Sequence, residues 1–179
     1  GMGLTICFDI GGTKIAAGVV GVDGALIATA RRETPATDPT MIEDQVADVF
    51  AELRRDHDID GVGVAAAGFV DGARGVVLFA PNLAWRDEPM MGDLQRRIGL
   101  PVTLENDANA ATWGEFRFGA ARDADDMVML TVGTGLGGGI VADGRLLRGA
   151  HGIGGELGHV RIVPEGRRCG CGNRGCWEQ

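Results

Sequence analysis

The stretch DIGGTK (residues 9–14) carries residue types that bind phosphate. An acid ends an apolar strand and is followed by two glycines, a hydroxyl and a cation. Glycine lets backbone N–H groups approach phosphate oxygens, Thr13 adds a donor, and Asp9 is a candidate to hold Mg²⁺ through water. Lys14 is the only lysine among 17 basic residues, and lysine acts on phosphate as a point charge. The stretch predicts a phosphate and magnesium site.

A second glycine loop, TVGTGLGGGI (131–140), predicts a second phosphate site through its backbone and Thr134. Neither loop fits the P-loop pattern G-x-x-x-x-G-K-[ST], and the dinucleotide pattern G-x-G-x-x-G is not clean in either. A structural turn remains the alternative for each loop.

The stretch ENDANA (105–110) joins an apolar strand to a helix. Asn106 or Asp107 at this place is typical of a helix N-cap. Asp107 is also a candidate general base, because a carboxylate can take the proton of a sugar hydroxyl during phosphoryl transfer. The two roles are compatible, with Asn106 as the cap and Asp107 as the base.

Three of the four cysteines lie within the eight residues CGCGNRGC. Structural zinc takes four ligands, often three cysteines and a histidine. Cys169, Cys171 and Cys176 supply three, and His159 is better placed than His151 to supply the fourth. The alternatives are a disulfide with one spare thiol, three unrelated thiols, or a zinc knuckle that binds nucleic acid.

The composition predicts a cytoplasmic globular protein. Hydrophobic residues make up 45% of the 179, no apolar run approaches the roughly 18 residues of a membrane span, and no secretory signal opens the chain. The net charge of −8 argues against nucleic acid and anionic membranes as partners.

Periodicity and turn residues predict alternating strands and helices. Strands are expected at 4–9, 14–20, 25–32, 61–66, 76–79, 102–104, 127–132 and 136–142, helices at 38–56, 89–98 and 107–118, and a loop at 81–85. Cys7, in the first strand, is expected in the core. The polar segment 121–126 predicts a boundary between domains at 1–120 and 121–179.

A weak internal repeat relates the two domains. GVVGVDGALI (18–27) matches GGIVADGRLL (138–147), and each copy follows a strand and a glycine loop and reaches an Asp-Gly turn. The pattern predicts one antiparallel hairpin in each domain.

The motifs DIGGTK, PNLAW, ENDANA, TVGTGLGGGI, GELGH and CGCGNRGCWEQ resemble, in this order, those of the ROK family (repressors, open reading frames, sugar kinases). The resemblance covers nearly the whole chain and is greatest to the bacterial ATP-dependent glucokinases of that family. It implies an α/β fold of the actin-like ATPase, ribonuclease H-like type, with the first domain complete and the second partial. The implied activity is transfer of the γ-phosphate of MgATP to the 6-hydroxyl of glucose.

The resemblance also implies roles for single residues. Asp107 becomes the catalytic base, in contact with the sugar. Further sugar contacts are implied at Gly68, Asn82, Asn106, Glu156, His159 and Glu178. The phosphate loops are implied at Asp9, Gly11, Gly12, Thr13 and Lys14, and at Gly133, Thr134 and Gly135. Zinc would hold His159 and Glu178 in place for the sugar.

Members of this family continue beyond the position of Gln179. We expect that continuation to supply the adenine pocket, closing helices and much of a homodimer or higher homo-oligomer contact. Several functions stay open besides glucose phosphorylation by ATP: an N-acetylglucosamine or N-acetylmannosamine kinase, a kinase using polyphosphate, a sugar-sensing regulator, and a non-catalytic sugar-binding fragment.

Overall fold

The computed structural model describes residues 3–35, 38–71, 75–80, 85–119, 121–132, 136–147, 163–169 and 173–174. The chain divides into two compact units, 1–107 and 108–179. The sequence predicted this boundary at 120/121. That position follows the C-terminal end of helix 107–118, whereas the observed boundary lies at its N-terminal end. Within the described residues, no helix combines the length and the apolar character needed to cross a bilayer.

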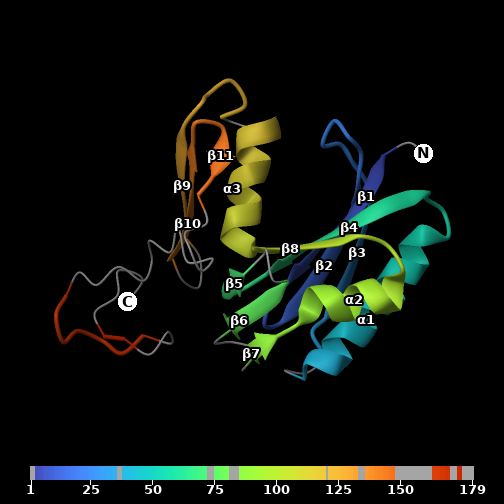
Figure 1. Ribbon diagram of the computed structural model, residues 1–179, viewed down its shortest axis with the longest axis horizontal. Helices are drawn as coiled ribbons and strands as arrows, with labels where there is room; N and C mark the ends of the chain where they lie inside the picture. The colour runs from blue at the N-terminus through green and yellow to red at the C-terminus, as the bar shows by residue number, and fades with distance from the viewer. Residues whose placement is uncertain are drawn as a thin grey trace. The chain divides into compact units, whose positions relative to one another are not determined.

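A five-stranded sheet forms the centre of the first unit (Figure 1). Its strands are β1 (Leu4–Ile10), β2 (Lys14–Val20), β3 (Leu26–Glu33), β4 (Ile59–Ala66) and β8 (Val102–Asn106), in the order β3-β2-β1-β4-β8. β1, β2 and β3 pair antiparallel, whereas β4 runs parallel to β1 and β8 parallel to β4. The parallel strands require crossovers, and helices supply them.

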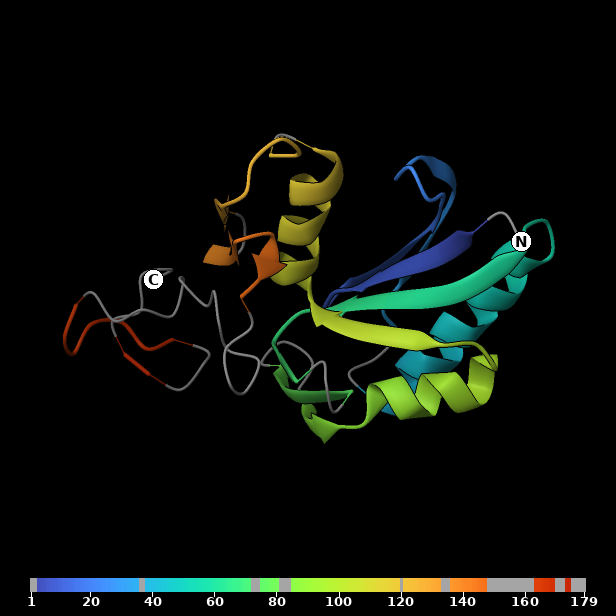
Figure 2. The same cartoon turned by 45° about the horizontal axis from the view of Figure 1, so that its top comes forward.

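Two helices cover one face of this sheet, as Figure 2 shows. α1 (Pro39–Arg54) begins after Asp38, whose side chain accepts hydrogen bonds from the backbone N–H groups of the first turn. α2 (Met90–Ile98) ends at Gly99, which has a left-handed φ of 77°. The buried apolar residues of both helices pack in one core with alternate residues of the strands.

The opposite face of the sheet is open, and this contradicts the prediction that Cys7 lies in the core. Along β1, Ile6, Phe8 and Ile10 are buried beneath the helices, whereas Cys7 and Asp9 are exposed. Cys7 is therefore not a core residue, because successive strand residues point to opposite faces of a sheet.

A small antiparallel sheet follows β4 in the first unit. It consists of β5 (Phe69–Asp71), β6 (Val76–Ala80) and β7 (Trp85–Glu88), in the order β5-β6-β7. The short strand β5 was not predicted, and Trp85, expected in a loop, begins β7 and pairs with Ala80. Only residues 81–84 of the expected loop remain between β6 and β7, and they lie outside the described residues.

The second unit contains α3 (Asp107–Phe118), whose first residue ends the first unit, and a three-stranded antiparallel sheet. The strands are β9 (Met127–Val132), β10 (Leu136–Ala142) and β11 (Arg145–Leu146), in the order β11-β10-β9. Asn109 and Thr112 are the buried residues of α3 among those described.

Both hairpins of the predicted repeat are confirmed, with different turns. In the first unit, the amide of Gly21 donates to the carbonyl of Ala25 at 3.0 Å, and Gly24 has a φ of 81°. In the second unit, Asp143 (φ 49°) and Gly144 (φ 74°) form a two-residue turn between β10 and β11. Each copy of the repeat therefore belongs to a set of three antiparallel strands. These are β1, β2 and β3 in the first unit, and β9, β10 and β11 in the second.

Candidate functional site

The predicted site residues of the first unit lie where three neighbouring parallel strands end. β1, β4 and β8 run in the same direction, and Asp9 of β1 pairs with Ala65 of β4, which pairs with Glu105 of β8. Ligands of open α/β sheets bind at the carboxyl ends of such strands. The arrangement thus brings the acid of the first glycine loop and the start of ENDANA to one edge of one sheet (Figure 1).

The first glycine loop is a tight connection between β1 and β2. The amide of Gly11 donates to the carbonyl of Lys14 at 2.9 Å. Thr34, which follows β3, fixes the loop from the side. Its amide donates to the carbonyl of Thr13 at 2.9 Å, and its hydroxyl donates to the carbonyl of Gly11 at 2.9 Å.

These bonds decide which amides of the loop are available to a ligand. The N–H of Gly11 is used inside the loop, whereas those of Gly12 and Thr13 form no hydrogen bond within the part of the chain that the structure describes. Gly12, Thr13 and Lys14 are all exposed. The loop can therefore offer two amides, a hydroxyl and an ammonium group to an anion.

Asp9 is the last but one residue of β1 and lies on the face of the sheet that the helices leave open. The residue is exposed, but partial burial of its carboxyl group raises the pKa of Asp9 above its ordinary value. A cation beside the carboxylate would favour its ionised form and oppose this shift. The position therefore suits a magnesium ion held next to the phosphate loop.

Asn106 joins the ends of β4 and β8. It is buried, and its side-chain amide donates to the carbonyl of Gly68, which has a φ of 124°. A φ in this range favours glycine. The structure thus places two of the predicted sugar contacts in direct contact with each other.

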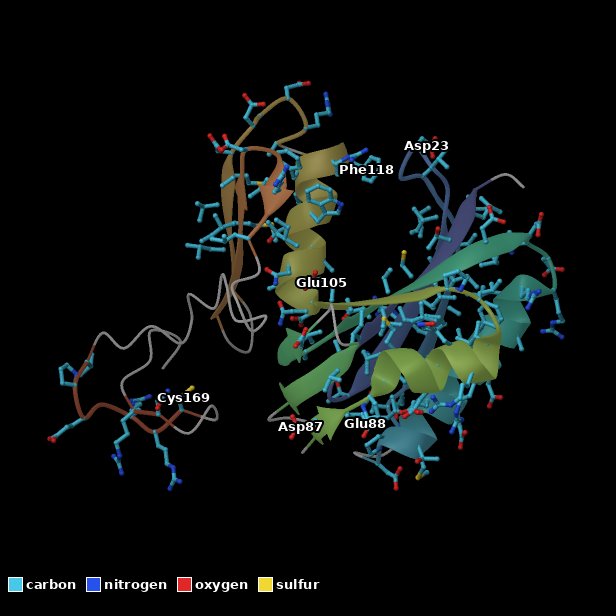
Figure 3. All side chains as sticks on the ribbon, in the orientation of Figure 1. Asp23, Asp87, Glu88, Glu105, Phe118 and Cys169 are labelled. Carbon is cyan, nitrogen blue, oxygen red and sulfur yellow. The ribbon has the colours of Figure 1, made fainter. Side chains whose placement is uncertain are left out.

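Asp107 is the first residue of α3 and follows the buried Asn106 directly. Figure 3 labels Glu105 at this junction, where β8 passes into the helix. The positive end of the helix dipole favours a carboxylate at this place. Asp107 therefore has a fixed position between the end of β8 and the start of α3, which suits the predicted general base. A role of Asn106 or Asp107 as the helix cap is compatible with this position.

Many of the predicted site residues lie outside the described residues. They are the sugar contacts Asn82, Glu156, His159 and Glu178, the second phosphate loop Gly133, Thr134 and Gly135, and the zinc ligands Cys171 and Cys176. Their roles stay predictions.

One predicted zinc ligand is described. Cys169 is 3% exposed and is not in a disulfide. Its amide donates to the carbonyl of Asn173 at 2.8 Å, and Arg168 forms an antiparallel bridge with Arg174. These contacts join residues 168–169 to residues 173–174, and Figure 3 labels Cys169 among them.

Thr34 is a residue that the sequence interpretation missed. It lies 20 residues after the loop that it supports, and its own sequence context is an ordinary strand end. The register of β2 with β3 pairs Lys14 with Glu33, and this places Thr34 beside Thr13. Only the strand pairing could have revealed it.

Comparison with known proteins places these features in a family. Residues 5–179 match the ROK family. The chain is 51% identical to a glucokinase of Streptomyces coelicolor, covering 99% of this chain and 56% of that protein. It is 38% identical to an N-acetylmannosamine kinase of Yersinia pseudotuberculosis, covering 99% of this chain and 60% of that protein.

A crystal structure of a ROK family glucokinase from Streptomyces griseus, in complex with glucose and AMPPNP, superimposes with a TM-score of 0.92. The two sequences are 53% identical, over 99% of this chain and 56% of that one. The predicted actin-like ATPase fold is confirmed, and the chain spans about half the length of the relatives it matches. With the family match over residues 5–179, this shows that the chain belongs to the ROK family.

Proposed function

We propose that the protein is an ATP-dependent glucokinase, which transfers the γ-phosphate of MgATP to the 6-hydroxyl of glucose. The observation that carries the proposal is the meeting of three motifs at one sheet edge: Asp9 before the glycine loop, Gly68 bonded to Asn106, and Asp107 at the start of α3. The similarity to glucokinases at 51% and 53% identity supports the choice of sugar and nucleotide.

Asp107 acts as the general base in this proposal. Glucose binds with its 6-hydroxyl at the carboxylate, which takes the hydroxyl proton as the phosphoryl group is transferred. The carboxylate needs a fixed position for this task, and the buried Asn106 beside it supplies one through its bond to Gly68. The remaining sugar contacts proposed are Asn82, Glu156, His159 and Glu178.

The loop between β1 and β2 holds phosphate oxygens of the nucleotide. The amides of Gly12 and Thr13 donate to them, and Lys14 contributes a positive charge. Magnesium, bound next to Asp9, supplies charge neutralisation between phosphate groups. Gly133, Thr134 and Gly135 form the second phosphate loop of the proposal.

A structural zinc ion, held by His159, Cys169, Cys171 and Cys176, is part of the proposal. The burial of Cys169 and the hydrogen bond from its amide to the carbonyl of Asn173 support it. The zinc loop fixes His159 and Glu178 for the sugar. The proposal further places the enzyme in the cytoplasm, as a homodimer or a higher homo-oligomer.

An N-acetylhexosamine kinase is the second candidate, because an N-acetylmannosamine kinase is 38% identical over 99% of this chain. The two candidates share the base and the phosphate loop and differ in the group they accept at the 2-position of the sugar.

The test is product formation by the chain with MgATP and either glucose, N-acetylglucosamine or N-acetylmannosamine, with Asp107→Asn as the matched control. We expect glucose 6-phosphate from the parent, a loss of at least about 10²-fold in kcat for Asp107→Asn, and glucose binding by both in calorimetry. Turnover by Asp107→Asn near the parental rate would contradict the role of the base. Preference for an N-acetylated sugar would select the second candidate, and absence of product with every sugar would refute kinase activity of this chain.

A further inference from the structure

A depression lies between the C-terminal parts of α1 and α2, which run side by side over one face of the sheet (Figure 2). Its volume is about 370 Å³, which falls in the range of small-molecule pockets. The apolar part of its lining consists of Ala47, Phe50, Ala51 and Ile98. The cationic part consists of Arg54, Arg55 and Arg97. Three guanidinium groups thus meet at one place in a chain whose net charge is −8.

This depression is distinct from the candidate site at the strand ends. α1 leads into β4 and α2 leads into β8, so the C-terminal parts of both helices lie beside the amino ends of these parallel strands. Asp9, Asn106 and Asp107 lie at the carboxyl ends. The eight residues of β4 separate the two places. The proposed phosphoryl transfer therefore does not explain the three arginines.

Two of the three arginines are without an acidic partner within the ranges that the structure describes. Arg54 and Arg55 form no ion pair there. Arg97, by contrast, pairs with Asp44, and its Nε atom lies 3.8 Å from Oε2 of Glu43. The carbonyl end of a helix attracts a cation in its last turn, but this effect does not require arginines of two helices to meet at one depression. Arg54 and Arg55 therefore have charge to offer to an anion.

Two of the guanidinium groups are held in place before a ligand binds. The guanidinium carbon of Arg54 lies 5.5 Å from the ring centroid of Phe50, which is 5% exposed. Attraction between the cation and this buried ring restricts the arginine side chain. Arg97 is restricted by its pairing with Asp44. Because ordering a side chain costs free energy on binding, this arrangement lowers the cost of binding an anion.

The charge and the lining of the depression indicate the chemical class of its ligand. A guanidinium group binds phosphate oxygens through two parallel N–H groups. A phosphate monoester carries a charge of about −1.5 to −2 at pH 7, which matches Arg54 and Arg55 together, whereas a single carboxylate matches only one of them. Ala47 is half-buried and Ala51 is exposed, so their methyl groups are accessible to an apolar part of the ligand.

We propose that the depression between α1 and α2 binds a phosphate monoester. The phosphoryl group lies between Arg54 and Arg55, and the organic part lies against Ala47 and Ala51. Arg97 borders the ligand while it keeps its pairing with Asp44. The site lies at the opposite end of the parallel strands from the proposed phosphate loop, so ligand binding there does not depend on the proposed kinase activity.

Phenyl phosphate is a suitable probe, because it joins a phosphoryl group to a small apolar ring. The ¹⁵N-labelled chain is titrated with phenyl phosphate and with inorganic phosphate at about 0.15 M salt, and the backbone amide shifts are followed by NMR. We expect saturable shifts in residues 47–55 and 97–99. Phenyl phosphate should bind about fivefold more tightly than inorganic phosphate, because part of its ring is removed from water. Equal affinities, shifts confined to Gly12 and Thr13, or no shifts at all would overturn the proposal.

Substitution of single arginines separates this site from a general attraction of anions. Arg54→Gln and Arg55→Gln should each weaken phenyl phosphate binding by about threefold to tenfold, because each removes a charged donor at an exposed position. The matched control is Arg96→Gln, because Arg96 is exposed on α2, pairs with Asp93 and does not line the depression. The control removes the same charge and should change the affinity by less than about twofold.

The three variants should fold like the parent, because glutamine is a good helix former and all three positions are exposed. Unchanged amide shifts of the sheet in the absence of phosphate check this. Equal losses of affinity in Arg54→Gln, Arg55→Gln and the control would show a non-specific attraction and would refute a built site. Parental affinity in both Arg54→Gln and Arg55→Gln would refute it as well.

Discussion

Gly139 determines how closely β10 approaches α3 in the second unit. A Cβ atom added at Gly139 would lie 2.1 Å from Oγ1 and 2.6 Å from Cβ of Thr112. Thr112 is fully buried, and its hydroxyl donates to the carbonyl of Ala108 at 2.7 Å. Rotation of the threonine side chain does not move its Cβ, so Gly139→Ala requires the strand and the helix to move apart.

The cost can be worked out from these contacts. Overpacking of a tightly packed site costs about 1–3 kcal/mol, and disturbing the hydroxyl bond of Thr112 costs about 1 kcal/mol. Replacing a strand glycine returns about 0.5–1 kcal/mol of backbone entropy. Gly139→Ala should therefore lower the free energy of unfolding of the second unit by about 1.5–3 kcal/mol.

Hydrogen exchange of the β9 and β10 amides, followed by NMR, reports on the second unit separately. A loss of about 1.5–3 kcal/mol corresponds to exchange roughly 10–150 times faster. The matched control is Gly114→Ala on α3 itself, where an added Cβ has no atom within 4 Å. The control should stabilise the helix by about 0.5–1 kcal/mol, because glycine is a poor helix former. The reasoning would be refuted if Gly139→Ala changed stability by less than about 0.5 kcal/mol or stabilised the unit as the control does.

The remaining predictions concern the phosphate loop and the zinc site. Thr34→Val removes the hydrogen bond from the hydroxyl to the carbonyl of Gly11. We expect the KM for ATP to rise about threefold to tenfold, whereas the glucose affinity measured by calorimetry stays unchanged. Equal losses in both quantities would indicate a folding defect instead. Metal analysis of the purified chain should find one zinc ion per chain, and Cys169→Ser should release it and weaken glucose binding. A parent chain free of zinc would exclude the metal site.

The strands and helices of the first unit were largely predictable from local patterns. The helix predicted at 38–56 is confirmed as α1 (Pro39–Arg54), and Asp38 caps its first turn. The prediction that Cys7 is buried was wrong, because a run of apolar residues in β1 concealed the alternation between a covered and an open face. β5 was missed because three residues are too few to show a period.

The contacts that organise the candidate site were less accessible to sequence reasoning. Motifs at strand ends could be recognised, because the relevant residues are contiguous. Thr34 could not, because it bonds a loop that ends 20 residues before it and its position depends on the register of β2 with β3. A single sequence carries no direct record of such pairings.

The register of the parallel strands links the two halves of the proposed chemistry. Ala66 of β4 pairs with Asn106 of β8, and this pairing allows the side chain of Asn106 to reach Gly68. A shift of one residue between these strands would turn Asn106 to the other face of the sheet and move Asp107 with it. Because β4 also pairs with β1, the same shift would alter the distance between the base and the phosphate loop that follows Asp9. The bond from Asn106 to Gly68 therefore depends on the same register that places Asp107 and the proposed phosphate loop at one end of the sheet.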